Sequence, residues 1–396
     1  MKKKKILVYD DDEKFTKQIR DCLSRVGAVR DEFEVSALPD QEFVPAMDIL
    51  VRRNRSMRKG DQANEGDCQF DDVDIVIVDQ DLLDSTAGEF VTGENVAYLL
   101  RCFSSCRLVV VLNQFDRRGQ VSFDLTLRGN PDSFADLNVA SDQIHNPNLW
   151  GGEKHGFFPW HWLRLPQYLE DFHEKLKDVE GGLDSPIREV LGIPDDVFAL
   201  LPRSAAQFLG KDPENSTFRQ FVCNSGQALK RKDADRVPDE VIARLGAARI
   251  SKWLERVVLP GQSILVDAPH LVSRYPSLLS VNNPKLNDWN ATARLSNQDD
   301  CEVLSPALQK HRLEKRHWAS KPVWYWTQVS EDLDIGEVTE PWDSKPAPYV
   351  FCEDDSQFHK EGSCQEFVAE TESPFSRRFV KQLRGIEYRP LVRLSM

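Results

Sequence analysis

The sequence predicts an α/β protein whose first third is a doubly wound parallel sheet covered by helices. Short apolar runs at residues 5–9, 74–78 and 108–112 have the length and composition of buried strands, and each run is followed by an acidic or amide residue. Helical patterns at about residues 15–26 and 96–103 alternate with these runs. Strand, helix and strand in succession indicate parallel strands joined by crossovers.

The other elements of this first third follow from local patterns. Gly27 stands where the first helix would need a left-handed C-terminal cap. Apolar and polar residues alternate over 33–37, which predicts a second strand that Pro39 ends. The segment 51–72 is polar and rich in Arg, Asn, Gly and Asp, so we expect an irregular insertion there.

A change in composition near residue 150 divides the rest of the chain. Residues 151–320 are expected to be mostly helical, and the clearest helix starts at Pro238 and ends at Pro260. Residues 321–396 mix aromatic strand-like pieces with acidic loops, which predicts a small α+β unit. A chain of 396 residues is too long for one ordinary core, so three units are reasonable.

Composition favours a globular cytoplasmic protein. Hydrophobic residues make up 40% of the chain, which is enough to bury real cores. No run approaches the ~20 apolar residues that cross a bilayer, and the basic start precedes too short an apolar run for a signal peptide, so we expect no membrane contact. The net charge of −13 excludes a uniform attraction to nucleic acid.

A basic tail from Ser376 is the one place where a nucleic-acid or phosphate contact could lie. We favour an ordinary solvated basic face, or an intramolecular contact with the acidic first third, as the explanation of these charges. Its basic residues are Arg377, Arg378, Lys381, Arg384, Arg389 and Arg393, against the single acid Glu387.

The eight cysteines are spread along the chain without a Cys-x-x-Cys pair, unlike a disulfide framework. We expect most of them to be reduced and buried. Cys352, His359 and Cys364 suggest zinc, but a structural zinc site needs four ligands and this spacing matches no familiar ribbon.

Acidic residues follow two of the predicted strands. Asp10 and Asp11 come directly after the first strand, and Asp79 follows the strand at 74–78. The carboxyl ends of neighbouring parallel strands form the crevice where α/β sheets bind ligands, so these carboxylates should meet. Crowded carboxylates repel one another unless a divalent cation or raised pKa values relieve the repulsion, and magnesium prefers such oxygen ligands.

The run Leu-Val-Tyr-Asp-Asp-Asp-Glu-Lys-Phe at 7–15 and the segment 74–83 resemble the opening and the phosphoacceptor strand of a two-component receiver (response-regulator) domain. The resemblance implies a flavodoxin-like fold over residues 1–150. It also implies that Asp79 takes a phosphoryl group from a histidine kinase, and that Asp10, Asp11, Asp79 and the backbone carbonyl of Asp81 hold Mg²⁺.

Two positions depart from that family. Receiver domains place Thr or Ser at the end of the fourth strand, where this chain has Asn113, whose amide can still donate a hydrogen bond. They also place Lys at the end of the fifth strand, but the candidate stretch 135–142 contains none. Binding of metal or phosphate without the usual switch, or use of the domain for docking alone, is consistent with both departures.

Three functions follow from these observations. The first is a phosphoacceptor regulator, rather than a turnover enzyme, in which the receiver-like domain controls an uncharacterised C-terminal output region or is read by another signalling protein. The second is a non-enzymatic scaffold, in which the degenerate receiver is a binding surface and the C-terminal region captures a partner protein. The third is a metal-dependent nuclease that uses Asp267, or the acids at 353–355, with the basic tail.

Overall fold

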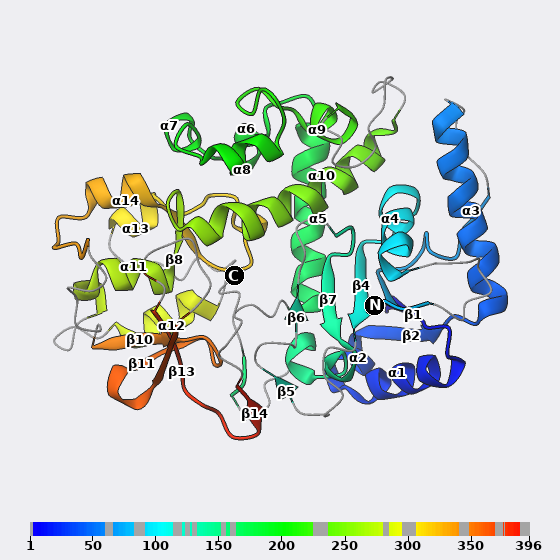
Figure 1. Ribbon diagram of the computed structural model, residues 1–396, viewed down its shortest axis with the longest axis horizontal. Coiled ribbons are helices and arrows are strands. Elements are labelled where there is room, and N and C mark those ends of the chain that lie inside the picture. The colour runs from blue at the N-terminus through cyan, green and yellow to red at the C-terminus, as the bar shows by residue number, and fades with distance from the viewer. Residues whose placement is uncertain are drawn as a thin grey trace.

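The computed structural model describes residues 3–59, 66–82, 92–113, 121–122, 127–128, 133–151, 156–158, 164–224, 237–279, 285–294, 306–339, 348–368, 375 and 377–388. Within them, the first sheet has the strand order β2-β1-β3-β4-β7-β6 (Figure 1). These strands are β1 (Lys4–Tyr9), β2 (Phe33–Ala37), β3 (Ile75–Asp79), β4 (Leu108–Asn113), β6 (Leu127–Arg128) and β7 (Leu137–Ala140).

Five neighbouring strands of this sheet are parallel, and only β6 runs antiparallel, at the β7 edge. The predicted α/β start with a parallel sheet is therefore confirmed, and its order β2-β1-β3-β4-β7 is the flavodoxin-like one. All five residues of β3 are buried. The β-branched composition of this strand suits a position that is covered on both faces.

Helices α1 (Glu13–Arg25), α2 (Gly27–Glu32), α3 (Asp40–Lys59) and α4 (Gly93–Phe103) connect the strands. The Asp12 carboxylate caps α1 by accepting from the Lys14 amide. The prediction of a glycine cap at Gly27 was wrong, because α1 ends at Arg25 with Val26 as an extended C-cap, and Gly27 begins α2.

The predicted irregular insertion at 51–72 was also wrong in its first half, because residues 51–59 continue α3. Residues 60–65 lie outside the described residues. Two hydrogen bonds to residues far along the chain stabilise this polar helix. The Arg53 guanidinium donates to the Asp71 carboxylate at 2.6 Å and to the Phe103 carbonyl at 2.7 Å. Met57 is buried one turn further on.

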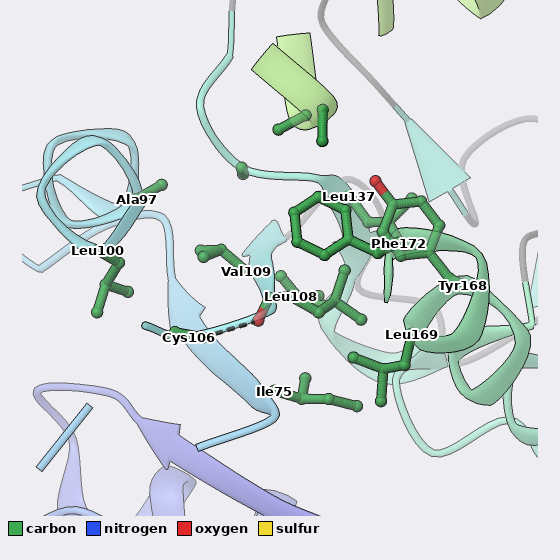
Figure 2. Packing of buried hydrophobic residues seen from close by; sticks show 14 of the residues in the cluster. Ile75, Ala97, Leu100, Cys106, Leu108, Val109, Leu137, Tyr168, Leu169 and Phe172 are labelled. Atoms are coloured by element: carbon green, nitrogen blue, oxygen red, sulfur yellow. Dashed lines mark hydrogen bonds between the residues drawn. The ribbon is translucent and has the colours of Figure 1, made fainter. Parts of the chain in front are cut away.

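Helix α5 (Leu165–Gly181) lies after residue 150 and contributes side chains to the hydrophobic core of the first sheet. Its Tyr168, Leu169 and Phe172 side chains lie against Leu137 and Leu108 of the sheet (Figure 2). Helix α10 (Asp239–Trp253) packs against both α4 and α5 and runs from there toward the C-terminal part of the chain (Figure 1). The apolar core of the sheet is therefore continuous with that of the helical region.

The helical region also contains α6 (Ile187–Leu191), α7 (Asp195–Phe198), α8 (Arg203–Phe208) and α9 (Phe218–Asn224). After α10 follow a π-helical turn at 254–258 and the strand β8 (Leu265–Asp267), which pairs antiparallel with β9 (Val323–Tyr325). The helices around this pair are α11 (Ala268–Arg274), α12 (Leu286–Arg294), α13 (Pro306–Lys310) and α14 (Trp326–Asp332).

A four-stranded sheet of order β11-β10-β13-β12 follows, at lower left in Figure 1. Its strands are β10 (Tyr349–Cys352), β11 (Gln357–Lys360), β12 (Gln365–Val368) and β13 (Arg377–Val380). Beyond it, β14 (Ile386–Glu387) pairs in parallel with β5 (Val121–Ser122), which lies in the crossover between β4 and β7. None of the described helices is long and apolar enough to span a bilayer.

Candidate functional site

The carboxyl ends of β1 and β3 bring Asp10 and Asp79 together. Tyr9 pairs with Val78 in the register of these parallel strands, so the next residues, Asp10 and Asp79, lie at the same level of the sheet. Both are nearly inaccessible to solvent, with 6% and 7% of their surface exposed. We call Asp10, Asp11 and Asp79 the strand-end acidic cluster.

Each buried carboxylate also fixes the loop that follows it. Asp10 Oδ1 accepts from the Asp12 amide at 2.8 Å, and Asp79 Oδ2 accepts from the Asp81 amide at 2.9 Å. Asp and Asn favour such turns because their short side chains reach the backbone two residues on. The Thr16 hydroxyl donates to the Asp10 carbonyl at 3.0 Å and holds the start of α1 against it.

Burial, together with the nearby charges of Asp79 and Asp11, raises the pKa of Asp10 to about 7, although the hydrogen bond from the Asp12 amide opposes this shift. Burial likewise raises the pKa of Asp79, and the charge of Asp11 adds to this. The strand-end acidic cluster is therefore close enough for its members to resist each other's ionisation.

Asp11 and Asp81 lie at the edge of this cluster. Asp11 is partly exposed, and its charge acts on both Asp10 and Asp79. Asp81 is exposed and forms an isolated antiparallel bridge with Thr92, just before α4. Asp84, which follows the same strand in the sequence, lies outside the described residues.

Gly93 packs directly against the backbone of Asp79, a contact that the sequence pattern did not reveal. A Cβ atom at this position would lie 2.5 Å from the Asp79 carbonyl oxygen and 3.0 Å from the Gln80 Cα. Thr92 caps α4 by accepting from the Asn95 amide at 3.3 Å. Glycine thus allows the first turn of α4 to approach the end of β3 closely.

Asn113 ends β4 as predicted, but its side chain is held by the neighbouring strand. The Asn113 amide donates to the Asn138 side-chain oxygen on β7 at 2.8 Å. At the end of β7, where a receiver domain has Lys, the Ser141 hydroxyl donates to the Asn113 carbonyl at 3.2 Å. Asn138 and Ser141 were missed because the strand pattern alone cannot assign partners across a sheet.

The strand-end acidic cluster offers only oxygen donors, which is the set that Mg²⁺ prefers. Among the residues that the structure describes, no three His, Cys, Asp or Glu side chains are gathered as a metal-binding group. A cation here would therefore need the Asp81 carbonyl, water or phosphoryl oxygens in addition to the carboxylates, which is common for Mg²⁺.

The carboxylates considered for a C-terminal nuclease site have structural contacts instead. Asp267 is buried and forms an ion pair with Lys321, with 2.9 Å between Oδ2 and Nζ. Although burial opposes its charge, the Lys321 ammonium lowers the pKa of Asp267 to about 2. Burial lowers the pKa of Lys321 to about 8, so both partners are charged near neutral pH.

The Asp354 carboxylate accepts several hydrogen bonds from the segment 381–388. It accepts from the Lys381 amide at 2.8 Å, the Gln382 amide at 3.0 Å and the Tyr388 hydroxyl at 2.6 Å. Gln382 adopts a positive φ of 60° in this turn. Asp354 therefore fixes the turn that leads from β13 to β14.

Two basic residues of the tail form ion pairs with acids of the C-terminal unit. Arg377 forms an ion pair with Glu366 at 2.5 Å, and the buried Arg378 lies 3.1 Å from Glu353. Arg389 and Arg393 lie outside the described residues.

Comparison of the chain with models of known protein families, with curated protein sequences and with solved structures found no match.

Proposed function

We propose that this protein is a signalling regulator whose N-terminal domain is an atypical receiver that accepts a phosphoryl group on Asp79. In this proposal Asp10, Asp11, Asp79 and the Asp81 carbonyl hold Mg²⁺, and a histidine kinase or a small phosphodonor supplies the phosphoryl group. The cation would neutralise the transferring group while the Asp79 carboxylate attacks it. The region beyond α5 would be the output.

One observation carries the proposal: Asp79 ends β3, Asp10 directly follows the adjacent parallel strand β1 in the same register, and both carboxyl groups are buried. Burying two acidic groups side by side is costly unless a proton or a cation relieves it. A fold selected for stability alone would gain from an amide at either position. A magnesium-assisted phosphoacceptor site would need both carboxylates, which explains why neither is an amide.

The test is phosphorylation of the full-length protein by acetyl phosphate in the presence of Mg²⁺, followed by intact-mass and peptide mass spectrometry. We expect one phosphoryl adduct on the peptide that contains Asp79, and loss of the adduct when Mg²⁺ is chelated. Asp79→Asn should remove it. Asp12→Asn is the matched control, because it removes a charge from the same edge while an amide oxygen can still cap α1.

The contacts of Asn113 favour a second candidate function, a scaffold that uses this domain only as a binding surface. Asn113 is tied to Asn138, and the end of β7 offers Ser141 where a receiver domain has Lys. Magnesium titration followed by tryptophan and tyrosine fluorescence separates the two functions. The regulator should show a saturable change that Asp10→Asn weakens, whereas a scaffold without a working site should show none.

A further inference from the structure

We propose that Cys352 and Cys364 form a reversible disulfide that clamps the C-terminal sheet. Cys352 ends β10, and Cys364 directly precedes β12. Their sulfur atoms lie 3.3 Å apart, in van der Waals contact. This modification site is separate from the strand-end acidic cluster, and it does not depend on the function proposed for that cluster.

The surroundings of the two thiols assign them different parts in the reaction. Cys352 is fully buried, and burial strongly raises the pKa of its thiol, so it is shielded from reagents in solution. Cys364 is partly exposed at the end of the 3-10 turn Glu361–Ser363 and can meet a reagent. A disulfide needs about 2.0 Å between the sulfur atoms, so a small rotation of the Cys364 side chain would close the gap.

The oxidant that we propose is a low-molecular-weight disulfide. The Cys364 thiol loses its proton, and its sulfur attacks one sulfur of the donor, forming a mixed disulfide and releasing one donor thiol. Cys352 then loses its proton and attacks the Cys364 sulfur, which releases the second donor thiol. The protein loses two hydrogen atoms and two electrons, and the donor disulfide is reduced to two thiols.

Zinc is the competing explanation for two adjacent cysteines. His359, the third residue of the sequence pattern, points its Nε2 at Asp355, 2.6 Å away. No group of three His, Cys, Asp or Glu ligands occurs in the described part of the chain. Two thiols in contact, with no third metal ligand gathered beside them among the described residues, fit a disulfide better than a structural metal site.

The bond would link the end of β10 to the residue that precedes β12, and these two strands are not neighbours in the sheet order. Asp354, two residues after Cys352, accepts hydrogen bonds from the turn at 381–388. Oxidation should therefore slow the local opening of this sheet and of the turn that leads to β14, and reduction should restore it.

The test is treatment of the full-length protein with glutathione disulfide, followed by alkylation under denaturing conditions and peptide mass spectrometry. We expect a Cys352–Cys364 cross-link that dithiothreitol reverses, with slower hydrogen exchange at 349–352 and 377–380. Cys352→Ser should leave a stable glutathione adduct on Cys364, because the thiol that resolves it is gone. Cys364→Ser should leave Cys352 unmodified.

Cys22→Ser is the control, because Cys22 is a partly exposed thiol on α1, far from this sheet in the fold (Figure 1). It should leave the cross-link intact. Cys352→Ala replaces Cys352→Ser if the serine variant unfolds. Separate glutathione adducts on both cysteines of the wild-type protein, or stoichiometric zinc that Cys364→Ser removes, would overturn the proposal.

Discussion

Asp10 and Asp79 leave neighbouring strands at the same level, and each binds the amide two residues beyond it. Because the Asp10 carboxyl group is buried, it makes the stability of the fold depend on pH. Burial raises the pKa of Asp10 from 3.8 to about 7, so between these values the folded protein keeps a proton that the unfolded chain has lost. The contribution of Asp10 to stability therefore falls as pH rises from about 4 to about 7 and changes little above that range.

Asp10→Asn should flatten this pH dependence, because the amide carries no charge at any pH. At about pH 8 the variant should be more stable than the wild type by roughly 1–4 kcal/mol, and at about pH 4 the two should be similar. Melting temperatures across this range measure the effect. Asp21→Asn, on the exposed side of α1, is the control. A variant that melts below the wild type at about pH 8 would contradict the argument.

Magnesium should stabilise the wild-type protein, because a ligand that binds only the folded state shifts the unfolding equilibrium. At a concentration ~100 times the dissociation constant the gain is about 2.7 kcal/mol. Differential scanning fluorimetry with Mg²⁺, against a potassium salt of equal ionic strength, measures it. The Mg²⁺-dependent shift should shrink in Asp10→Asn and in Asp79→Asn. An equal shift in both variants would place the cation elsewhere.

Gly93→Ala should destabilise the protein and disturb the Asp79 loop. The new methyl group would lie 2.5 Å from the Asp79 carbonyl oxygen, so backbone must move to admit it. Such overpacking typically costs about 1–3 kcal/mol. Gly27→Ala is the matched control, since a Cβ there meets nothing within 4 Å and Gly27 also begins a helix. Thermal unfolding compares them, and equal melting temperatures would be the contrary result.

Lys321→Met should destabilise the C-terminal half by about 3–5 kcal/mol, because Asp267 would remain buried without its cation. The double variant Asp267→Asn/Lys321→Met should recover part of this loss, since neither side chain is then charged. Urea unfolding followed by tryptophan fluorescence gives both values. Asp267→Asn is measured alone as well. If the stability losses of Lys321→Met and Asp267→Asn simply add in the double variant, the two side chains are not coupled.

The strands could be predicted because their signal is local. Ile75–Val78 is β-branched and apolar throughout, and it could only be a buried strand. Once parallel strands were expected, topology placed Asp10 beside Asp79 without further information. The strand-end acidic cluster was therefore within reach of sequence reasoning.

The errors and omissions share one physical cause, which is dependence on distant partners. The second half of α3 looked irregular because Arg53 finds its anchor, Asp71, outside the helix. The Gly93 contact with Asp79, and the Asn113 bond to Asn138, connect separate elements that no local pattern links. The two-residue strands β5 and β14 are too short to leave a periodic signature.

The pairing of β14 with β5 has a consequence for biosynthesis. Residues 121–122 are made long before residues 386–387, the strand that pairs with them. Domains that emerge early from the ribosome generally fold first. The strand at 121–122 must therefore wait for its partner until the C-terminal sheet has been made, and a chain released before residue 386 would lack this pairing.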